Sequence, residues 1–374
     1  MATPQEILAV TLDKVSRNLD TSYISDPVHR RRVVAICRNL QNRACARALL
    51  ACLLAKMHRP ELDIRKPYTE IGDYDSYSGR KYDERYIADF VATHELPCNR
   101  TTAFLTPALR NHDAMLERNT NLVGRPPGIY EDMLALLDDV AQKIIAPQDL
   151  LSEIVRVLVV LRNERRQRLS SMLANLHTSQ SSMLSVDMIV NIVQTHLAQP
   201  HGSRLPVLAI LAIYKTIQDK LNEHVVSLHA HNAADSQTRS FGDLEVAVKD
   251  SERVITVYEM KTRKITRDDF EQAMQKLSSN KGDVQQYLFI GTQPVSEDVQ
   301  EIVRDLNERA IGIEFAALDC ISFVRYFLHL FYQARLDFLN IYQELVLSEP
   351  ESGVRHPMKE LLLSLRQTAE STQF

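Results

Sequence analysis

The sequence predicts an α/β fold in which helices flank a mixed sheet, preceded by a large and mainly α-helical N-terminal region. Three observations predict it. Apolar side chains recur at helical spacing through much of residues 1–199. Residues 242–261 carry apolar, β-branched runs on either side of a charged turn, as a β-hairpin does. From residue 206 the predicted order is helix, hairpin, helix, strand, helix, strand, helix, which fits one sheet between helices.

The individual elements follow from spacing and from turn residues. In the N-terminal part, helices are predicted over residues 5–19, 28–58, 129–145, 148–172 and 186–197. The polar stretch 199–204, with Pro200 and Gly202, is the best candidate for a domain boundary. Beyond the boundary we expect helices over 206–229, 266–279, 297–310, 320–347 and 358–365, and strands over 287–292 and 311–318.

The hairpin carries the most informative residues of the chain. If its turn centres on Ser251, Asp243 lies opposite Glu259. Because side chains alternate between the two faces of a strand, one face then carries Asp243, Glu245, Glu259 and Lys261. Apolar residues occupy both faces of the same hairpin, so these charges should be paired or bind a metal. The alternative is an exposed hairpin with surface ion pairs.

This clustering predicts a metal-dependent active site. Neighbouring carboxylates repel one another unless a cation lies between them, and hard oxygen ligands with open positions suit Mg²⁺. A metal held by Asp243 and Glu259 would polarise a phosphodiester and activate a water molecule. Lys261 could orient or deprotonate that water, or stabilise charge on the phosphoryl oxygens. The predicted catalytic residues are therefore Asp243, Glu259 and Lys261.

Composition limits the class of protein. The net charge of −4 excludes a basic nucleic-acid coat protein, so a DNA enzyme of this composition needs local basic patches. No apolar run has the length of a membrane span, and the N-terminus lacks the blocks of a signal peptide. An odd number of cysteines, five, favours a reduced cytoplasmic setting. The absence of Gly-x-Gly-x-x-Gly and P-loop motifs argues against a metabolic nucleotide-binding enzyme.

Residues 67–111 form a second informative stretch. Five tyrosines lie within nineteen residues, interleaved with arginine, lysine and short polar side chains, a composition typical of recognition surfaces. Such a loop could contact phosphates and read a base edge; the alternative is that the tyrosines pack against their own domain. With Arg239 from the polar loop predicted over residues 230–241, the candidate DNA-binding residues are Ser78, Arg80, Lys81, Arg85, Arg100, Arg110 and Arg239. The basic run 29–32 is either a phosphate contact or a solvated helix start.

Two motifs together carry a family resemblance. Asp243 followed by Glu259-Met260-Lys261 matches the PD-(D/E)XK nuclease motif, with Gly242 where many members carry proline. With the segment 81–85, Lys-Tyr-Asp-Glu-Arg, the chain resembles the SacI-family type II restriction endonucleases over most of its length. The resemblance implies a PD-(D/E)XK core and Mg²⁺-dependent cleavage of double-stranded DNA at a short sequence. It also implies a homodimer and a cognate DNA methyltransferase in the same system.

These expectations predict three regions in the chain, and two alternative functions remain open. Residues 1–199 would be a mainly helical DNA-recognition region, 200–350 the nuclease core and 351–374 a C-terminal tail. Cleavage would give 5′-phosphate and 3′-hydroxyl ends. One rival is a non-catalytic DNA-binding or defence-complex module that retains the nuclease fold. Another is a nuclease for modified or branched DNA.

Overall fold

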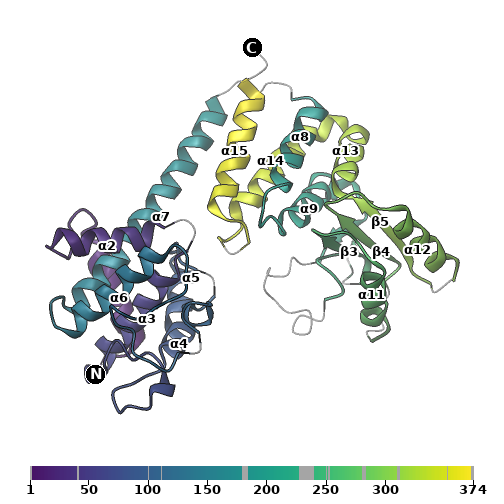
Figure 1. Cartoon of the computed structure of the whole chain (residues 1–374). Coiled ribbons are helices and arrows are strands. Elements are labelled where there is room, and N and C mark those ends of the chain that lie inside the picture. Colours follow the sequence, from purple (N-terminus) through teal and green to yellow (C-terminus); the bar gives the residue numbers. More distant parts are fainter. Residues whose placement is uncertain are drawn as a thin grey trace. The chain divides into compact units, whose positions relative to one another are not determined.

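The computed structural model divides the chain into two compact units, Met1–Arg168 and Leu169–Phe374 (Figure 1). It describes residues 2–39, 42–99, 101–110, 112–178, 184–226, 240–249, 251, 253–279, 284–309, 312–351 and 353–371. The division falls well before residue 199, because helix α8 (Val186–Leu197) packs against helices α13 and α15 of the second unit. This division separates two compact units and assigns no role to either of them.

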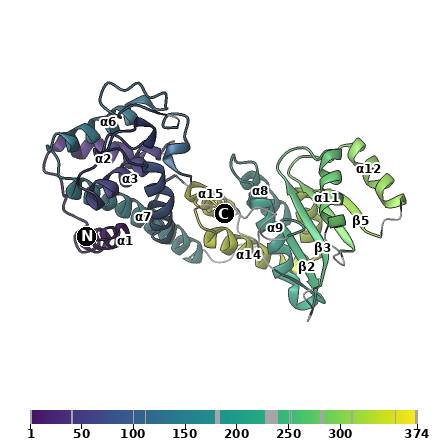
Figure 2. The ribbon, with the colours of Figure 1, turned by 90° about the horizontal axis from the view of Figure 1, so that it is seen from below.

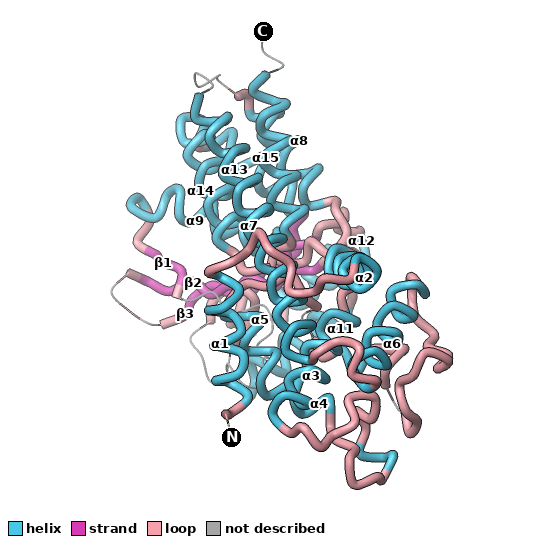
Figure 3. The backbone as a smooth tube through the Cα atoms, turned by 90° about the vertical axis from the view of Figure 1, so that its left-hand side faces the viewer, coloured by secondary structure: helices cyan, strands magenta, loops and turns pink. Residues whose placement is uncertain are grey.

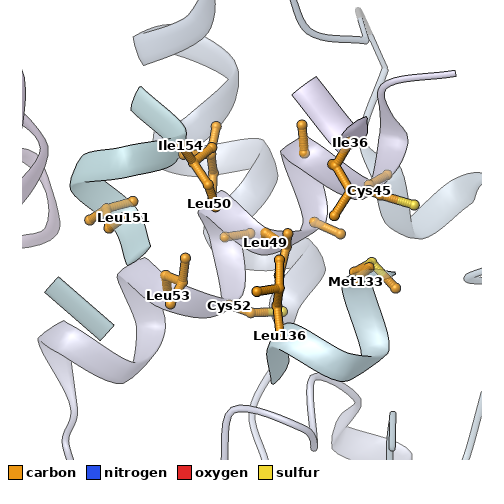
Figure 4. Close-up of a cluster of buried hydrophobic side chains, with 14 of the residues drawn as sticks. Ile36, Cys45, Leu49, Leu50, Cys52, Leu53, Met133, Leu136, Leu151 and Ile154 are labelled. Carbon is orange, nitrogen blue, oxygen red and sulfur yellow. The ribbon is translucent and has the colours of Figure 1, made fainter. Parts of the chain in front are cut away.

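The first unit is built around one buried helix. Its helices are α1 (Pro4–Ser16), α2 (Pro27–Arg38), α3 (Ala44–His58), α4 (Gly79–Tyr82), α5 (Ala88–Thr93), α6 (Pro127–Ala141) and the first part of α7 (Pro147–Thr178). Residues 44–55 of α3 are all buried, which suits a helix that is apolar all round. Figure 4 shows Leu49, Leu50 and Leu53 of α3 among apolar side chains of α2, α6 and α7.

The structure corrects the single helix predicted over residues 28–58. Two helices occupy this range, and α2 ends at Arg38 while α3 begins at Ala44. The side-chain oxygen of Asn39 accepts a hydrogen bond from the backbone N–H of Asn42 (2.8 Å), and that of Asn42 accepts one from Ala44 (2.9 Å). Asparagine side chains compete for backbone groups in this way and so favour a break between helices.

Among the described residues, the second unit holds a five-stranded mixed sheet in the order β1-β2-β3-β4-β5. Its strands are β1 (Glu223–Val225), β2 (Leu244–Val248), β3 (Val254–Lys261), β4 (Gln286–Gly291) and β5 (Glu314–Asp319), drawn in magenta where visible in Figure 3. Strand β2 pairs antiparallel with β1 and β3, and β4 pairs parallel with β3 and β5. Helices α11 (Arg267–Ser279) and α12 (Glu297–Glu308) connect the parallel strands. The predicted α/β fold with a mixed sheet is confirmed.

Helices cover both faces of this sheet (Figure 2). On one face lie α8, α9 (Leu205–Ile217), α13 (Cys320–Leu330), α14 (Arg335–Ser348) and α15 (His356–Ser371), which share a core with Tyr258 and Met260 of β3. On the other face, α11 and α12 share a core with Val257 of the same strand. Apolar side chains on both faces are what a sheet between two helical layers requires.

Three predicted elements of the second unit are corrected. Helix α9 ends at Ile217, and the chain then forms strand β1 at the edge of the sheet, so the helix predicted to residue 229 is too long. The helix predicted over 320–347 is two helices, because Arg335 donates hydrogen bonds to the carbonyls of Tyr332 (2.9 Å) and Leu184 (3.0 Å) at the break. The helix predicted over 358–365 is longer in the structure, where α15 spans His356–Ser371 and buries Leu362 and Leu363 in the core.

None of the helices in the described part of the chain combines the length and the apolar character that a membrane span needs.

Candidate active site

The register of the hairpin places the predicted site residues side by side. Leu244 lies opposite Tyr258 and Glu245 opposite Val257, which brings Asp243, directly before β2, to the end of β3 that carries Glu259 and Lys261. The backbone N–H of Asp243 donates to the Tyr258 carbonyl (2.9 Å), which extends the pairing to this end. A bulge between Val246 and Ala247 lies nearer the turn and leaves the carboxylate end in register.

Gly242 lets the chain approach β3 closely just before Asp243. A Cβ atom at this position would lie 2.6 Å from the Val257 side chain and 2.7 Å from the Tyr258 carbonyl oxygen. Those distances are too short for any side chain, so glycine is needed for the close approach. This gives a physical reason for glycine where many proteins with the motif carry proline.

The charged side chains then make distinct contacts. Asp243 accepts a hydrogen bond from the backbone N–H of Met260 (Oδ2, 2.7 Å), and the Lys261 ammonium lies 3.0 Å from Glu259 Oε1. Both side chains of the Glu259–Lys261 pair are about one-sixth exposed, at 16% and 17%. Glu245 is buried and accepts hydrogen bonds from Ser240 Oγ (2.9 Å) and the Phe241 N–H (2.6 Å). These hydrogen bonds fix residues 240 and 241, shortly before β2, to the strand itself.

Helix α11 brings two further charged residues to the site, and the sequence argument missed both. Asp269 Oδ1 lies 3.1 Å from the Lys261 ammonium. The Lys276 ammonium, two turns further along α11, lies 3.9 Å from Glu259 Oε2. Their presence at the site could have been found only from the order of the elements. A helix that connects two parallel neighbouring strands returns over the face of the sheet, so residues of α11 come to lie over β3.

Asp269 is held firmly enough to position Lys261. Arg263 binds both of its oxygens (2.6 and 2.8 Å), and the Thr266 N–H donates to Oδ2 (2.9 Å) at the start of α11. Burial opposes ionisation of Asp269, but the hydrogen bonds from Arg263, Thr266 and Lys261 lower its pKa to about 2. Burial likewise opposes the charge on Lys261, yet Glu259 and Asp269 raise its pKa above the ordinary value. Lys261 is therefore an ammonium group in this arrangement.

The carboxylate end of the hairpin offers oxygen donors of the kind that Mg²⁺ takes in proteins. Asp243 and Glu259 supply hard oxygen donors from adjacent strands. Within the described residues, no group of three or more histidine, cysteine or acidic side chains forms a metal-binding cluster. Two carboxylates nevertheless suit Mg²⁺, which retains several waters and takes phosphate oxygens as further ligands.

The structure brings three of the predicted DNA-binding residues together in the first unit. Ser78, Arg80 and Arg110 line one cavity of about 390 Å³, together with aromatic side chains that include Tyr68 and Phe104. Lys81 and Arg85 are exposed but do not line it. Arg80 pairs with Glu84 (2.7 Å), Ser78 caps α4, and Arg85 lies over the Tyr86 ring. Arg100 and Arg239 lie outside the described residues.

The tyrosine-rich segment divides between the two roles left open by the sequence. Tyr68 and Tyr77 are buried and donate hydrogen bonds to the carbonyls of Leu109 (2.8 Å) and Ile64 (2.9 Å), so they belong to the core of their own unit. Tyr74, in contrast, is 92% exposed. Only part of this segment is thus a free surface.

Other charged residues that the sequence singled out serve the packing of the first unit. In the segment 81–85, Asp83 is fully buried and pairs with Arg47 of α3 (2.5 Å). In the basic run 29–32, His29 and Arg32 contact Asp139 of α6 at 3.1 and 3.3 Å. Asp139 therefore holds His29 and Arg32 in the packing of α2 against α6, while Arg30 and Arg31 of the same run are exposed.

One comparison with known proteins bears on this domain. Residues 181–292 match the model of the SacI restriction endonuclease C-terminal domain. No curated protein matches the sequence. The matched range contains the whole hairpin, with Asp243, Glu259 and Lys261, as well as α11. The resemblance predicted from the sequence is therefore confirmed over residues 181–292, and the segment 81–85, which also carried it, lies outside the matched range.

Proposed function

We propose that this protein is a type II restriction endonuclease that hydrolyses double-stranded DNA at a short specific sequence, with Mg²⁺ as cofactor. The observation that carries the proposal is the meeting of Asp243, Glu259 and Lys261 at one end of a hairpin inside the matched domain. The order of strands and helices around the hairpin supports a PD-(D/E)XK core.

Each residue of the site has a defined task in this proposal. Asp243 and Glu259 would hold Mg²⁺, which when bound supplies Lewis acidity at the scissile phosphate. The ammonium of Lys261 would stabilise the negative charge that develops on the phosphoryl oxygens, and would orient the attacking water. Asp269 would fix the position of that ammonium. The water oxygen forms the new bond to phosphorus as the bond to O3′ breaks, and the products are a 5′-phosphate and a 3′-hydroxyl.

Recognition of DNA would also involve the first unit. Its cavity lined by Ser78, Arg80 and Arg110 offers guanidinium and hydroxyl donors of the kind that contact phosphates. A type II enzyme cuts both strands, which a homodimer would achieve with two copies of the site. A cognate methyltransferase would protect the DNA of the cell that makes the enzyme.

The test is cleavage of a long unmethylated phage DNA by the purified protein with Mg²⁺. Lys261→Ala is the informative variant, with EDTA as the metal control. Lys264→Ala is the matched control, because Lys264 is exposed and lies three residues further along the chain. We expect discrete bands from the wild type and from Lys264→Ala, and a loss of on the order of 10²–10³-fold in rate for Lys261→Ala.

Each other outcome favours a different function. Random fragments would retain the nuclease and remove the specific recognition sequence. Cleavage restricted to methylated or branched DNA would indicate a nuclease for such substrates. Binding to DNA without cleavage of any substrate, by the wild type and Lys261→Ala alike, would indicate a non-catalytic module.

A further inference from the structure

A large cavity lies at one edge of the sheet in the second unit. It has a volume of about 950 Å³ and lies beyond the carboxyl ends of β3, β4 and β5. Thr262, Thr292 and Asp319, which line it, follow or end these three parallel strands. Lys261 ends β3 and the next residue, Thr262, lines the cavity, so the cavity and the candidate site lie at the same end of this strand. In open α/β sheets, ligands bind in the crevice at the carboxyl ends of the strands.

The side chains that line this cavity are a mixture of polar and apolar groups and are almost uncharged. No lysine or arginine is among the described residues that line it, and Asp319 is the one carboxylate. Asp319 accepts a hydrogen bond from the Ser322 N–H (2.7 Å), so it caps α13. A surface that grips the DNA backbone needs lysine or arginine to neutralise phosphates. This cavity therefore suits a neutral ligand group.

Glutamines from separate elements converge on the cavity. Gln194 lies on α8, Gln199 on the link to α9, Gln293 on the link from β4 to α12, and Gln300 on α12. The amides of Gln199 and Gln300 donate to the carbonyls of Thr195 and Ala317, at 3.2 Å each. Within the described residues, no hydrogen bond holds the side-chain amides of Gln194 and Gln293, and both side chains are exposed.

We propose that this cavity reads base edges of the DNA, and that Gln194 and Gln293 determine part of the sequence specificity. The inference rests on the proposed nuclease function. Glutamine amides donate and accept at once and can bind the adenine edge in a bidentate manner, while threonine hydroxyls accept or donate at any base. Such contacts carry sequence information, whereas cationic contacts to phosphates do not. The arginines of the first unit would then position the DNA.

The experiment measures base preference at each position of the recognition sequence. A library of duplexes with randomised sequence is cut by the wild type and by Gln293→Ala, Gln194→Ala and Gln333→Ala, and the cleaved ends are sequenced. Gln333 is exposed and does not line the cavity, so its variant is the matched control. The same library is enriched by binding to each variant combined with Lys261→Ala, so that a slowly cutting variant still reports its preference.

We expect Gln293→Ala or Gln194→Ala to lose discrimination at one or two base positions, on the order of 5- to 150-fold, while Gln333→Ala keeps the wild-type pattern. Unchanged preference in both cavity variants, beside a specific wild type, would overturn the inference and leave the proposed function standing. A wild type that cuts without preference, or that cuts nothing, would overturn the proposed function and the inference together.

Discussion

The buried ion pair of the first unit permits a sharp prediction about stability. Asp83 is completely buried, and its carboxylate contacts Arg47 Nε at 2.5 Å. The same carboxylate accepts hydrogen bonds from Thr102 Oγ1 (2.7 Å) and the Ala103 N–H (2.9 Å). Asp83→Ala would leave the Arg47 guanidinium buried without its counter-charge, and would release the segment that leads to one wall of the cavity in that unit.

The size of the effect follows from the burial. Removing one partner of a buried pair costs about 3–5 kcal/mol, since the remaining charge has lost its solvation. For a unit of this size each kcal/mol corresponds to roughly 2–4 °C, so the melting temperature should fall by about 6–20 °C. Burial raises the pKa of Asp83 even though Arg47 lies beside it, so desolvation outweighs attraction in this pair. Replacing both residues, with Arg47→Met and Asp83→Leu, should therefore cost less than Asp83→Ala alone.

Urea denaturation measures the free energy of unfolding and thermal denaturation the melting temperature, both followed by circular dichroism. Asp89→Ala is the matched control, because Asp89 is an exposed acid in the neighbouring helix α5. The control should stay within about 0.5 kcal/mol of the wild type. If Asp83→Ala behaves like the control, or if the double replacement is the least stable variant, the reasoning about desolvation is wrong.

Three further predictions concern the second unit. Gly242→Ala should destabilise the protein by about 1–3 kcal/mol in the same denaturation assay, because its Cβ would lie 2.7 Å from a backbone oxygen of the opposite strand. Burial lowers the pKa of His196 from 6.5 to about 4, so the unfolded chain binds its proton first as the pH falls. Stability should therefore decrease between pH 6.5 and 4, by up to about 3 kcal/mol, and His196→Gln should flatten this decrease in a pH series of melts. Asp269→Asn should slow cleavage about 10- to 100-fold with DNA binding retained, because the Lys261 ammonium loses its fixed partner. The control is Asp268→Asn, at an exposed neighbouring acid, which should cleave at the wild-type rate. Equal cleavage rates for the two variants would contradict the positioning role of Asp269.

The hairpin could be predicted because its information is local. β-Branched residues, alternation and a charged turn specify both strands, and the centre of the turn at Ser251 specifies the register. The sequence also contained the break between α2 and α3, in Asn39 and Asn42, although the apolar spacing across them favoured one helix. Strand β1 differs, because three residues at the edge of a sheet are decided by their partner strand rather than by their own propensity.

The charges in the first unit show what local sequence leaves undetermined. Arg32 and Asp83 both belong to segments whose composition suggests a recognition surface. Each has a partner far away in the chain, Asp139 for Arg32 and Arg47 for Asp83. A cation paired across two helices and a cation that faces solvent look identical in sequence. Only the burial of the side chain distinguishes the two kinds of cation, and burial depends on which helices pack together.

Helix α11 links the folding of the second unit to the chemistry of its candidate site. An acid in the first turn of a helix favourably meets the helix dipole, and Asp269 also accepts the Thr266 N–H that the helix start leaves open. The same carboxylate fixes the Lys261 ammonium. Because the start of the helix holds Asp269 and β3 holds Glu259, two separate elements supply the carboxylates that fix the Lys261 ammonium. Precise placement of this kind is what stabilisation of a developing charge requires, so the residues that form α11 are part of the candidate active site.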